Sequence, residues 1–209
     1  MAYLFHIISL KADLSESVFL CYARRMKEQK DLEAVILANE QMMQVLGIIA
    51  DLGLADSWLC AGTIRNFIWN KGVFDAETDI DLIFYDKTVS YEETLEIERQ
   101  LRQVFPNYQW EVKNQVYMHH HNPNTQPYSS SKDAMSKYPE RCTAIGVRLL
   151  VDGRLDIFCP YGLEDIFQYQ VRPTPHFQTD PARKALYRER VAKKNWLSKW
   201  PNLTIIFPE

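Results

Sequence analysis

The chain has 209 residues, of which 46% are hydrophobic and 24% charged, and its formal net charge is -3. This composition is typical of a globular protein and excludes a fibrous or disordered one, while the slight acidity gives no overall attraction to nucleic acid or anionic membranes. We therefore expect one domain over residues 26–209 that acts on a small substrate, preceded by an N-terminal extension over residues 1–25.

The cysteines and the apolar segments indicate the compartment. The four cysteines lie far apart without a CxxC pair, which predicts free thiols and no zinc site or disulfide framework. No apolar run reaches the roughly 20 residues that a membrane span needs. The first 14 residues lack the basic start and small-residue cleavage site of a signal peptide. We expect a cytoplasmic protein with no membrane partner.

The first half of the chain predicts helices around a short buried strand. From residue 26 to residue 54, apolar residues recur every three or four positions, which predicts a helical segment. The apolar sequence WLC then predicts a short buried strand or the entry to a helix, followed by a helix that Gly72 ends. The sequence TDIDLIFYD at 78–86 is typical of a strand in a covered sheet, and residues 91–104 predict a surface helix.

The second half predicts a further strand, a long loop, a hairpin and basic helices. A strand is expected over 108–118, after Pro106 and Asn107 end the preceding helix. Residues 119–141 are polar and turn-rich, and loops of that length are often functional. Two β-rich runs around Asp152 and Gly153 predict a hairpin. The aromatic residues of the basic C-terminal helix are expected to pack in the core rather than stack on a base: Tyr187, Trp196 and Trp200.

An acidic pair and a preceding helix start suggest phosphate chemistry. Asp79 and Asp81 are two residues apart in a predicted strand, so both side chains leave the same face. Two such carboxylates can hold Mg²⁺ ions about 3.5 to 4 Å apart, the arrangement that clamps both oxygens of a phosphoryl transfer. An Asp-x-Asp sequence alone is more often a solvated strand edge. Here Gly62, Thr63 and Arg65 precede it in a helical first turn, where they offer N–H groups, a hydroxyl and a guanidinium to phosphates.

With these motifs in this order, the sequence resembles the DNA polymerase β-like nucleotidyltransferase superfamily, which has Gly-Ser or Gly-Gly at a helix start and then an Asp-x-Asp or Asp-x-Glu strand. It resembles more closely a bacterial nucleotidyltransferase family of unassigned substrate. Seven segments between residues 30 and 200 carry this resemblance: AGTIRNFIW, TDIDLIFYD, WEVKNQVYMH, PYSSSKDAM, GVRLLVDGRLDIFCPYGLEDIF, VRPTP and ERVAKKNWLSKWP.

The resemblance implies an α+β fold, with a mixed β-sheet flanked by helices. It also implies magnesium ligands at Asp79 and Asp81. The nucleotide-binding residues that it implies are Gly62, Thr63, Arg65 and Asn66. The chain departs from the superfamily pattern at Thr63, where Ser or Gly is usual, and threonine keeps the hydroxyl while it adds a methyl group.

The superfamily usually supplies a third carboxylate, which would act with Asp81 on the catalytic metal and help to deprotonate the attacking hydroxyl. Asp156, in the second arm of the predicted hairpin and ahead of a proline, is our first choice. Glu111, in the strand after the surface helix, is the alternative. Each would instead face solvent if it only paired with a basic neighbour, such as Arg154 or Lys113.

Other polar residues are candidate substrate ligands: Lys113, Asn114, Gln115, His119, Arg148 and Arg172. The first three form a polar cluster suited to phosphate or sugar hydroxyls, although a polar strand face explains them equally well. Three consecutive histidines begin at His119, and neighbours on an extended chain cannot converge on one ion, so we expect a substrate or acid-base role there and no metal. The two arginines suit phosphate charge, or they pair with carboxylates.

These residues predict a Mg²⁺-dependent enzyme that transfers a nucleoside monophosphate from an NTP to a hydroxyl of a small-molecule acceptor. Its catalytic and metal-binding residues would be Asp79, Asp81 and Asp156, and a nucleic acid partner is not expected. A protein of the same fold that binds nucleotides without turnover, as a regulatory or antitoxin-like module, is the alternative, because of Thr63 and the open choice of third carboxylate. A protein that acts only through interactions would need an acidic pair that binds no divalent ion.

Overall fold

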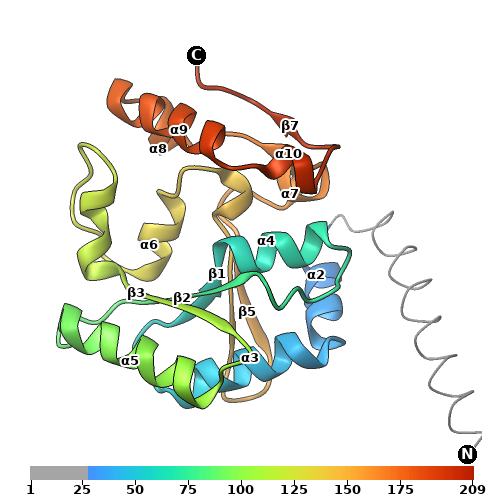
Figure 1. The fold of residues 1–209 in the computed structure, drawn as a ribbon, viewed down its shortest axis with the longest axis vertical. Coiled ribbons are helices and arrows are strands. Elements are labelled where there is room, and N and C mark those ends of the chain that lie inside the picture. The colour runs from blue at the N-terminus through green and yellow to red at the C-terminus, as the bar shows by residue number, and fades with distance from the viewer. Residues whose placement is uncertain (1–27) are drawn as a thin grey trace, which may run out of the picture.

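The computed structural model describes residues 28–209, so the extension expected over residues 1–25 lies outside the described part of the chain. Five strands form one mixed sheet in the order β3-β2-β1-β4-β5 (Figure 1). They are β1 (Trp58–Cys60), β2 (Asp79–Phe84), β3 (Gln109–Asn114), β4 (Gly146–Leu149) and β5 (Leu155–Phe158). Strands β2 and β3 are parallel, and the other neighbours are antiparallel. The predicted α+β fold with a mixed sheet is confirmed.

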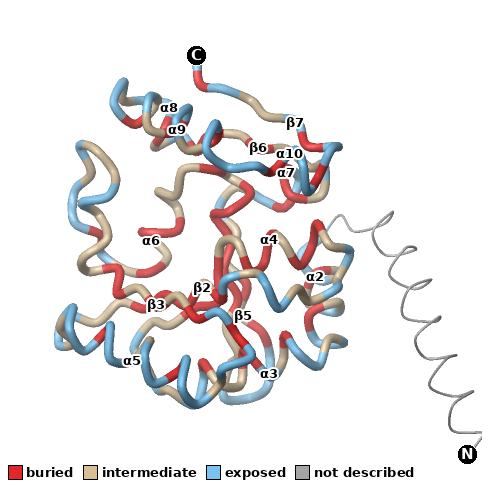
Figure 2. The backbone as a smooth tube through the Cα atoms, viewed as in Figure 1, coloured by how far each residue is buried: buried red, intermediate tan, exposed pale blue. Residues whose placement is uncertain are grey.

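One face of the sheet forms the main hydrophobic core. Every second strand residue points into it, including Leu59, Ile80, Leu82 and Val112, all nearly or fully buried. The helices that pack on this face include α2 (Gln29–Leu37), α3 (Glu40–Asp51) and α4 (Ala61–Trp69). Figure 2 shows buried residues along the strands and on parts of these helices. The alternate residues of β2 and β3 must therefore leave the opposite face.

The helical segment predicted over residues 26–54 is broken in the structure. Helices α2 and α3 meet at an angle of 92°. Asn39 has an extended backbone, and its side chain accepts the N–H of Met42 at 2.9 Å, so it caps α3 and ends the continuous helix. Among the described residues no single helix is long and apolar enough to cross a membrane, and the bent pair α2–α3 meets that criterion only when joined.

The edge strand β3 is held by α5 (Tyr91–Val104), which has the same bounds as the predicted surface helix. Glu98 accepts the outward N–H of Val112 at 2.8 Å, and Arg102 donates to the carbonyl of Trp110 at 2.7 and 3.0 Å. These bonds satisfy backbone groups that an edge strand otherwise leaves open. Strand β3 is thus fixed by β2 on one side and by α5 on the other.

The polar stretch 119–141, expected as a loop, contains short helices. They are η1 (Gln115–His121), α6 (Ser131–Ser136) and η2 (Arg141–Thr143). Helix α6 covers part of the second sheet face, where Met135 packs with Trp58, Cys60 and Ile83. A Cβ at Gly146 would lie 2.6 Å from the Met135 sulfur, so a larger residue there would displace the Met135 side chain. The second face is therefore closed beside β1 and β4, where α6 packs.

The C-terminal part forms a separate layer on the other side of α4, at the top of Figure 1. It consists of α7 (Glu164–Phe167), β6 (Gln170–Val171), α8 (Pro175–Gln178), α9 (Pro181–Lys193), α10 (Trp196–Lys199) and β7 (Thr204–Ile205). Strands β6 and β7 pair in parallel. Tyr187, Trp196 and Trp200 are buried, as expected. Cys60, Cys142 and Cys159 are free thiols.

Candidate active site

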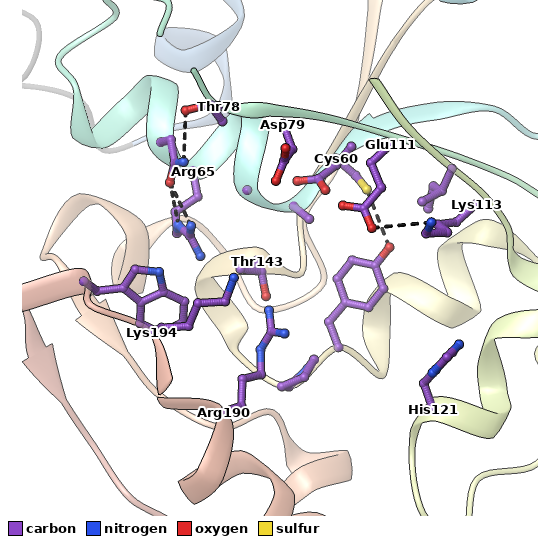
Figure 3. Close-up of a pocket in the computed structure, with 18 of the residues that line it drawn as sticks. Cys60, Arg65, Thr78, Asp79, Glu111, Lys113, His121, Thr143, Arg190 and Lys194 are labelled. Atoms are coloured by element: carbon purple, nitrogen blue, oxygen red, sulfur yellow. Dashed lines mark hydrogen bonds and ion pairs between the residues drawn. The ribbon is translucent and has the colours of Figure 1, made fainter. Parts of the chain in front are cut away.

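A cavity of about 640 Å³ lies between the open part of the second sheet face and the C-terminal layer. Its walls come from the start of α4, from β2 and β3, from η1, and from α9 and α10 (Figure 3). Asp79 and Asp81 both line it, as their two-residue spacing in a strand predicts. Asp79 is exposed, Asp81 is mostly enclosed, and the intervening Ile80 is buried in the core on the other face.

Helix α4 begins directly against Asp81. The carboxylate oxygen Oδ2 of Asp81 accepts the N–H of Thr63 at 3.2 Å, and a Cβ at Gly62 would lie 2.8 Å from the same oxygen. Only glycine therefore lets the helix start approach the carboxylate so closely. Ala61 has a φ of 50°, in the left-handed region, and this unusual conformation lets β1 turn at once into α4.

The Thr63 hydroxyl is hydrogen-bonded to the backbone of β2. It donates to the carbonyl of Asp79 at 2.7 Å and accepts the N–H of Asp81 at 2.8 Å, and the residue is 3% exposed. A hydroxyl has one proton to donate, and here the carbonyl of Asp79 accepts it. Thr63 is therefore a positioning residue that ties α4 to the acidic pair, and the expectation that its hydroxyl binds phosphate does not fit this geometry.

Arg65 and Asn66 line the cavity, one turn into α4. The Arg65 guanidinium lies 4.8 Å from the ring centre of Trp69 and 4.9 Å from that of Trp196. Its Nε and Nη2 donate to Asn66 Oδ1 at 3.1 and 2.8 Å, and Asn66 in turn donates to the Thr78 hydroxyl at 3.3 Å. No carboxylate of the described residues is within salt-bridge distance of Arg65, so its charge remains available to an anion in the cavity.

Glu111 is the carboxylate that stands beside the pair. The parallel register aligns Glu111 on β3 with Asp81 on β2, and both line the cavity. Burial, and next the negative charge of Glu111, raise the pKa of Asp81 to about 6, while the N–H of Thr63 and the charge of Arg65 oppose that rise. Two acids this close favour a cation between them.

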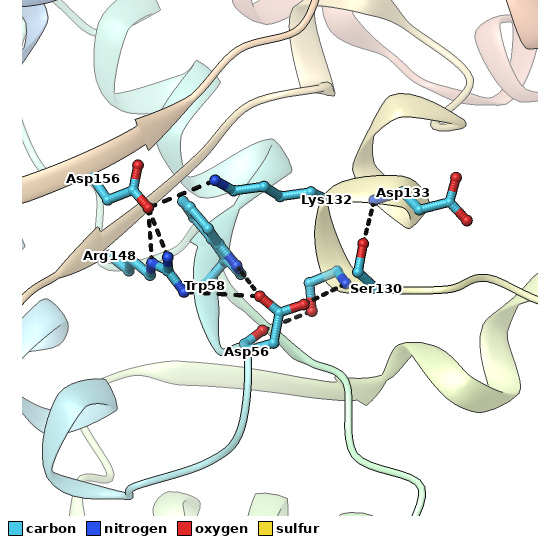
Figure 4. Close-up of polar contacts among 8 residues, drawn as sticks. Asp56, Trp58, Ser130, Lys132, Asp133, Arg148 and Asp156 are labelled. Carbon is cyan, nitrogen blue, oxygen red and sulfur yellow. Dashed lines mark hydrogen bonds and ion pairs between the residues drawn. The ribbon is translucent and has the colours of Figure 1, made fainter.

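Asp156, our first choice as the third carboxylate, is not brought to this cavity. It lies on β5, three strands from β2, which is roughly 14 Å at about 4.8 Å per strand. Its Oδ2 accepts hydrogen bonds from Arg148 at 2.8 and 3.0 Å and lies 3.7 Å from the Lys132 ammonium (Figure 4). The structure thus places the alternative, Glu111, beside the acidic pair and places Asp156 in an ion-paired cluster.

The other candidates divide between the cavity and the framework. Lys113 and Gln115 line the cavity. Asn114, between them, is fully buried and points away, and its side-chain amide donates to the carbonyls of Asp86 at 2.7 Å and Val89 at 3.1 Å. Because successive strand residues face opposite sides, Lys113 and Asn114 of β3 cannot both reach one ligand.

His119, Arg148 and Arg172 do not line the cavity. Burial, and next the charge of His120, lower the pKa of His119, and His121 lines the cavity in its place. Arg148 belongs to the Asp156 cluster and lies 4.3 Å from the Trp58 ring centre. Arg172 lies 3.3 Å from Asp165. Both arginines therefore pair with carboxylates, which was the alternative to phosphate binding.

Comparison with known proteins gives the family. A family model described as nucleotidyltransferase matches residues 47–205, which include every strand of the sheet. The chain belongs to this nucleotidyltransferase family. An NMR structure described as revealing a CCA-adding enzyme head domain is 55% identical, with a TM-score of 0.82, over 87% of this chain and 97% of that one. The resemblance found in the sequence is confirmed.

Two further structures match at much lower identity. A tRNA nucleotidyltransferase complexed with a primer tRNA and an incoming ATP analogue is 15% identical, with a TM-score of 0.48, over 78% of this chain and 46% of that one. The Bacillus stearothermophilus CCA-adding enzyme in complex with CTP is 14% identical, with a TM-score of 0.49, over 80% of this chain and 41% of that one. No curated protein matches the sequence.

In this nucleotidyltransferase a basic wall faces the carboxylates, and the sequence did not predict it. Arg190, Lys194 and Lys199 all line the cavity from α9, α10 and the break between them. Arg190 lies 2.6 Å from the fully buried Glu140, and Lys199 lies 2.6 Å from Asp75. The basic composition of the last helices was the available signal, but their position opposite β2 depends on tertiary folding.

The nucleotidyltransferase cavity suits a divalent cation bound with a phosphate ligand. Among the described residues, no three carboxylate, imidazole or thiolate side chains are already grouped closely enough to hold an ion alone. Mg²⁺ is usually bound by one or two carboxylates, with substrate phosphates and waters as the remaining ligands. Asp79, Asp81 and Glu111 offer such carboxylates, and the cations across the cavity suit the phosphates.

Proposed function

We propose that this nucleotidyltransferase transfers a nucleoside monophosphate from an NTP to a hydroxyl of a small-molecule acceptor, in the cytoplasm, with Mg²⁺ held by Asp79, Asp81 and Glu111. One observation carries the proposal: the three carboxylates share a cavity with the start of α4 and face the cations Arg65 and Lys194. Carboxylates on one side and cations on the other are complementary to a metal-bound triphosphate.

The chain's own residues orient the reaction. The acceptor oxygen forms a bond to the α-phosphorus, the bridging oxygen between the α- and β-phosphates leaves with pyrophosphate, and Glu111 takes up the acceptor proton. Arg65 and Lys194 bind the phosphates, and Thr63 fixes the spacing of α4 and β2. Bound Mg²⁺ supplies positive charge that neutralises the triphosphate. Most of the rate enhancement then comes from positioning and charge.

Transfer to the 3′ end of a polynucleotide is the second candidate. The description of the 55% identical structure as a CCA-adding enzyme head domain favours it. The acidic net charge of -3 favours the small acceptor instead, because nucleic acid binding rests on an excess of basic residues around the phosphates.

The test uses labelled NTPs and two sources of acceptor. The protein is incubated with Mg²⁺, each NTP in turn, and either a cell metabolite extract or RNA, and products are sought as mass shifts of one nucleoside monophosphate. We expect a labelled metabolite, which the double variant Asp79→Asn/Asp81→Asn no longer forms and the control Asp156→Asn still forms. Labelled RNA alone would establish the second candidate. NTP binding without any product would favour the alternative of a binding protein without turnover.

A further inference from the structure

The cavity continues past Glu111 into a part that the NTP phosphates do not explain. Figure 3 shows Lys113 and His121 on the side of Glu111 away from Arg65 and Lys194. This part is lined by residues of β3, η1 and the segment after η1, and we call it the η1 side of the cavity: Lys113, Gln115, Met118, His121, Asn122 and Tyr128. The interpretation of the η1 side rests on the proposed function, because that function assigns the phosphates of the NTP to the α4 side of the cavity.

The η1 side carries one ammonium group, that of Lys113, and several side chains that form hydrogen bonds. The Lys113 ammonium lies 3.5 Å from Glu111 Oε1 and 3.9 Å from Glu98 Oε2, both longer than a tight ion pair, and its side chain is 36% exposed. The nearest carboxylate that lines the cavity is Glu111 itself, at the border with the donor side. A ligand group beside Lys113 is therefore favoured when it is anionic.

Hydroxyl recognition is available next to this charge. Asn122 donates to the Tyr128 phenol oxygen at 2.8 Å, which leaves the phenol proton and the Asn122 carbonyl oxygen for a ligand. Burial raises the pKa of Tyr128, so the phenol keeps its proton. A donor and an acceptor side by side are suited to a hydroxyl group, which both donates and accepts.

The segment that carries these groups is fastened at both ends. Arg183, which is 8% exposed, donates to the carbonyls of Pro123 at 3.3 Å and Asn124 at 2.9 Å. Thr125 shares a hydrogen bond of 2.8 Å with His176.

At its other end, the Tyr85 hydroxyl donates to the carbonyl of Tyr128 at 2.9 Å. The segment after η1 is therefore hydrogen-bonded to α8 and α9 near Pro123 and to the residue after β2 at Tyr128. These bonds hold Asn122 and Tyr128 in a fixed arrangement. Preorganised groups of this kind are characteristic of a binding site.

We propose that the η1 side is the acceptor subsite and that it takes a small anion bearing a hydroxyl group, a phosphate or carboxylate, with the anionic group against Lys113 and His121 and the hydroxyl beside Asn122, Tyr128 and Glu111. The acceptor hydroxyl attacks from there, forms the new bond from its oxygen to the α-phosphorus and gives its proton to Glu111, while pyrophosphate leaves toward Arg65 and Lys194. Acceptor and leaving group thus lie on opposite sides of the carboxylates, as an in-line displacement requires.

The test measures anion binding directly. The ¹⁵N-labelled protein, with Mg²⁺ and whichever α,β-methylene NTP binds it, is titrated with inorganic phosphate and, in a second arm, with acetate, and amide shifts are followed by NMR. We expect saturable shifts over residues 113–122 with at least one of the two anions, and the stronger binder identifies the anionic group. Lys113→Gln should weaken this binding at least tenfold, and the matched control Lys132→Gln, which lies outside the cavity, should leave it unchanged.

Three outcomes would overturn the inference: shifts confined to α9 and α10, equal binding by Lys113→Gln and wild type, or an oligoribonucleotide that saturates residues 113–122 at far lower concentration than either anion. Thermal unfolding of the variant confirms that it is folded. If no NTP analogue binds, the proposed function fails by itself, and the same titration without the analogue still decides whether the η1 side binds anions.

Discussion

Two groups of carboxylates lie on the same face of the central sheet in opposite surroundings. Val147 pairs with the core residue Leu59, so the next residue, Arg148, leaves the opposite face. Its partner Asp156 therefore shares that face with Asp81. The first group, the cavity carboxylates, is Asp79, Asp81 and Glu111. The second, the Arg148 cluster, is Asp56, Lys132, Arg148 and Asp156 (Figure 4).

The difference lies in the partners. In the Arg148 cluster, Asp156 has Arg148 at 2.8 Å and Lys132 at 3.7 Å, and Asp56 accepts the N–H groups of Trp58 and Ser131 at 3.0 and 2.7 Å. In the cavity, Asp81 accepts backbone N–H groups at the start of α4, and the nearest cation to Glu111 is 3.5 Å away. Asp156 thus has a cation at 2.8 Å, whereas the nearest cation to Glu111 lies at 3.5 Å and, among the described residues, Asp79 and Asp81 have no salt bridge. The cavity carboxylates can therefore accept a bound cation.

The largest expected effect is the loss of NTP turnover when a cavity carboxylate, but not one of the Arg148 cluster, is replaced. Asp79→Asn or Asp81→Asn should lower NTP turnover by at least about 10³-fold, because metal-assisted charge stabilisation is worth several kcal/mol and each 1.4 kcal/mol is tenfold. Pyrophosphate release is the measurement. Asp156→Asn is the matched control and should stay within about threefold of wild type. A comparable loss in the control would erase the distinction between the groups.

Glu111 sharpens the comparison, because it lies beside Asp81 in the cavity and we propose it, in place of Asp156, as the third carboxylate. Glu111→Gln should lower turnover by about 10²-fold or more, the range of a lost general base. It should also lower the pKa of Asp81 in the metal-free protein from about 6, since the charge of Glu111 helps to raise it. Carboxyl ¹³C NMR measures that pKa. An unchanged Asp81 titration in this variant would show that the two side chains do not interact.

Gly62 tests the close approach of α4 to the cavity carboxylates. Gly62→Ala places a Cβ 2.8 Å from Asp81 Oδ2, which must displace the helix or the carboxylate. A shift of this kind should cost roughly 10²-fold in turnover. Gly47→Ala, in α3 with nothing within 4 Å of the new Cβ, is the matched control and should stabilise the protein by up to about 1 kcal/mol. Full activity of Gly62→Ala would mean that the helix start can relax freely.

The raised pKa of Asp81 predicts a pH-dependent stability of the metal-free protein. The unfolded chain releases this proton near 3.8 and the folded chain near 6, so the folded state binds more protons between these values. Stability should therefore fall as the pH rises from about 4 to 6, by up to about 3 kcal/mol. Urea unfolding at several pH values measures it. Asp81→Asn should remove this slope, and a variant that keeps it would assign the effect to another group.

The smallest expected effect belongs to the Arg148 cluster. Lys132→Gln removes a half-exposed ammonium 3.7 Å from Asp156, so it should change the free energy of unfolding by no more than about 1 kcal/mol. Turnover should not change. A large loss of activity with normal stability would extend the functional site to this part of the sheet.

Local signals in the sequence predicted most of the fold. Helix α5 has its predicted bounds, and the hairpin around Asp152 and Gly153 forms, with Gly153 at a φ of 83°. Strand β1 leads into α4, and β2 carries the acidic pair. The break at Asn39 was missed because the apolar periodicity continues through it, and only the capping hydrogen bond ends the helix.

Predicting the complete site requires the order of the strands in the sheet, and the hydrophobic periodicity of the sequence does not contain that order. Glu111 stands beside Asp81 because β2 and β3 are adjacent, parallel and in register. Asp156 is remote because β1 and β4 lie between β2 and β5. The spacing of side chains along one strand predicted the pair Asp79 and Asp81, whereas the third carboxylate and the basic wall of Arg190 and Lys194 depend on contacts between segments far apart in the chain.

The hydrogen bonds that α5 makes to β3 also limit how copies of this protein can assemble. With the amide of Val112 and the carbonyl of Trp110 already occupied by Glu98 and Arg102, no strand from a second copy can extend the sheet at this position. Amyloid-like or domain-swapped growth through β3 would first require α5 to detach. Helix α5 therefore prevents aggregation through the edge of strand β3.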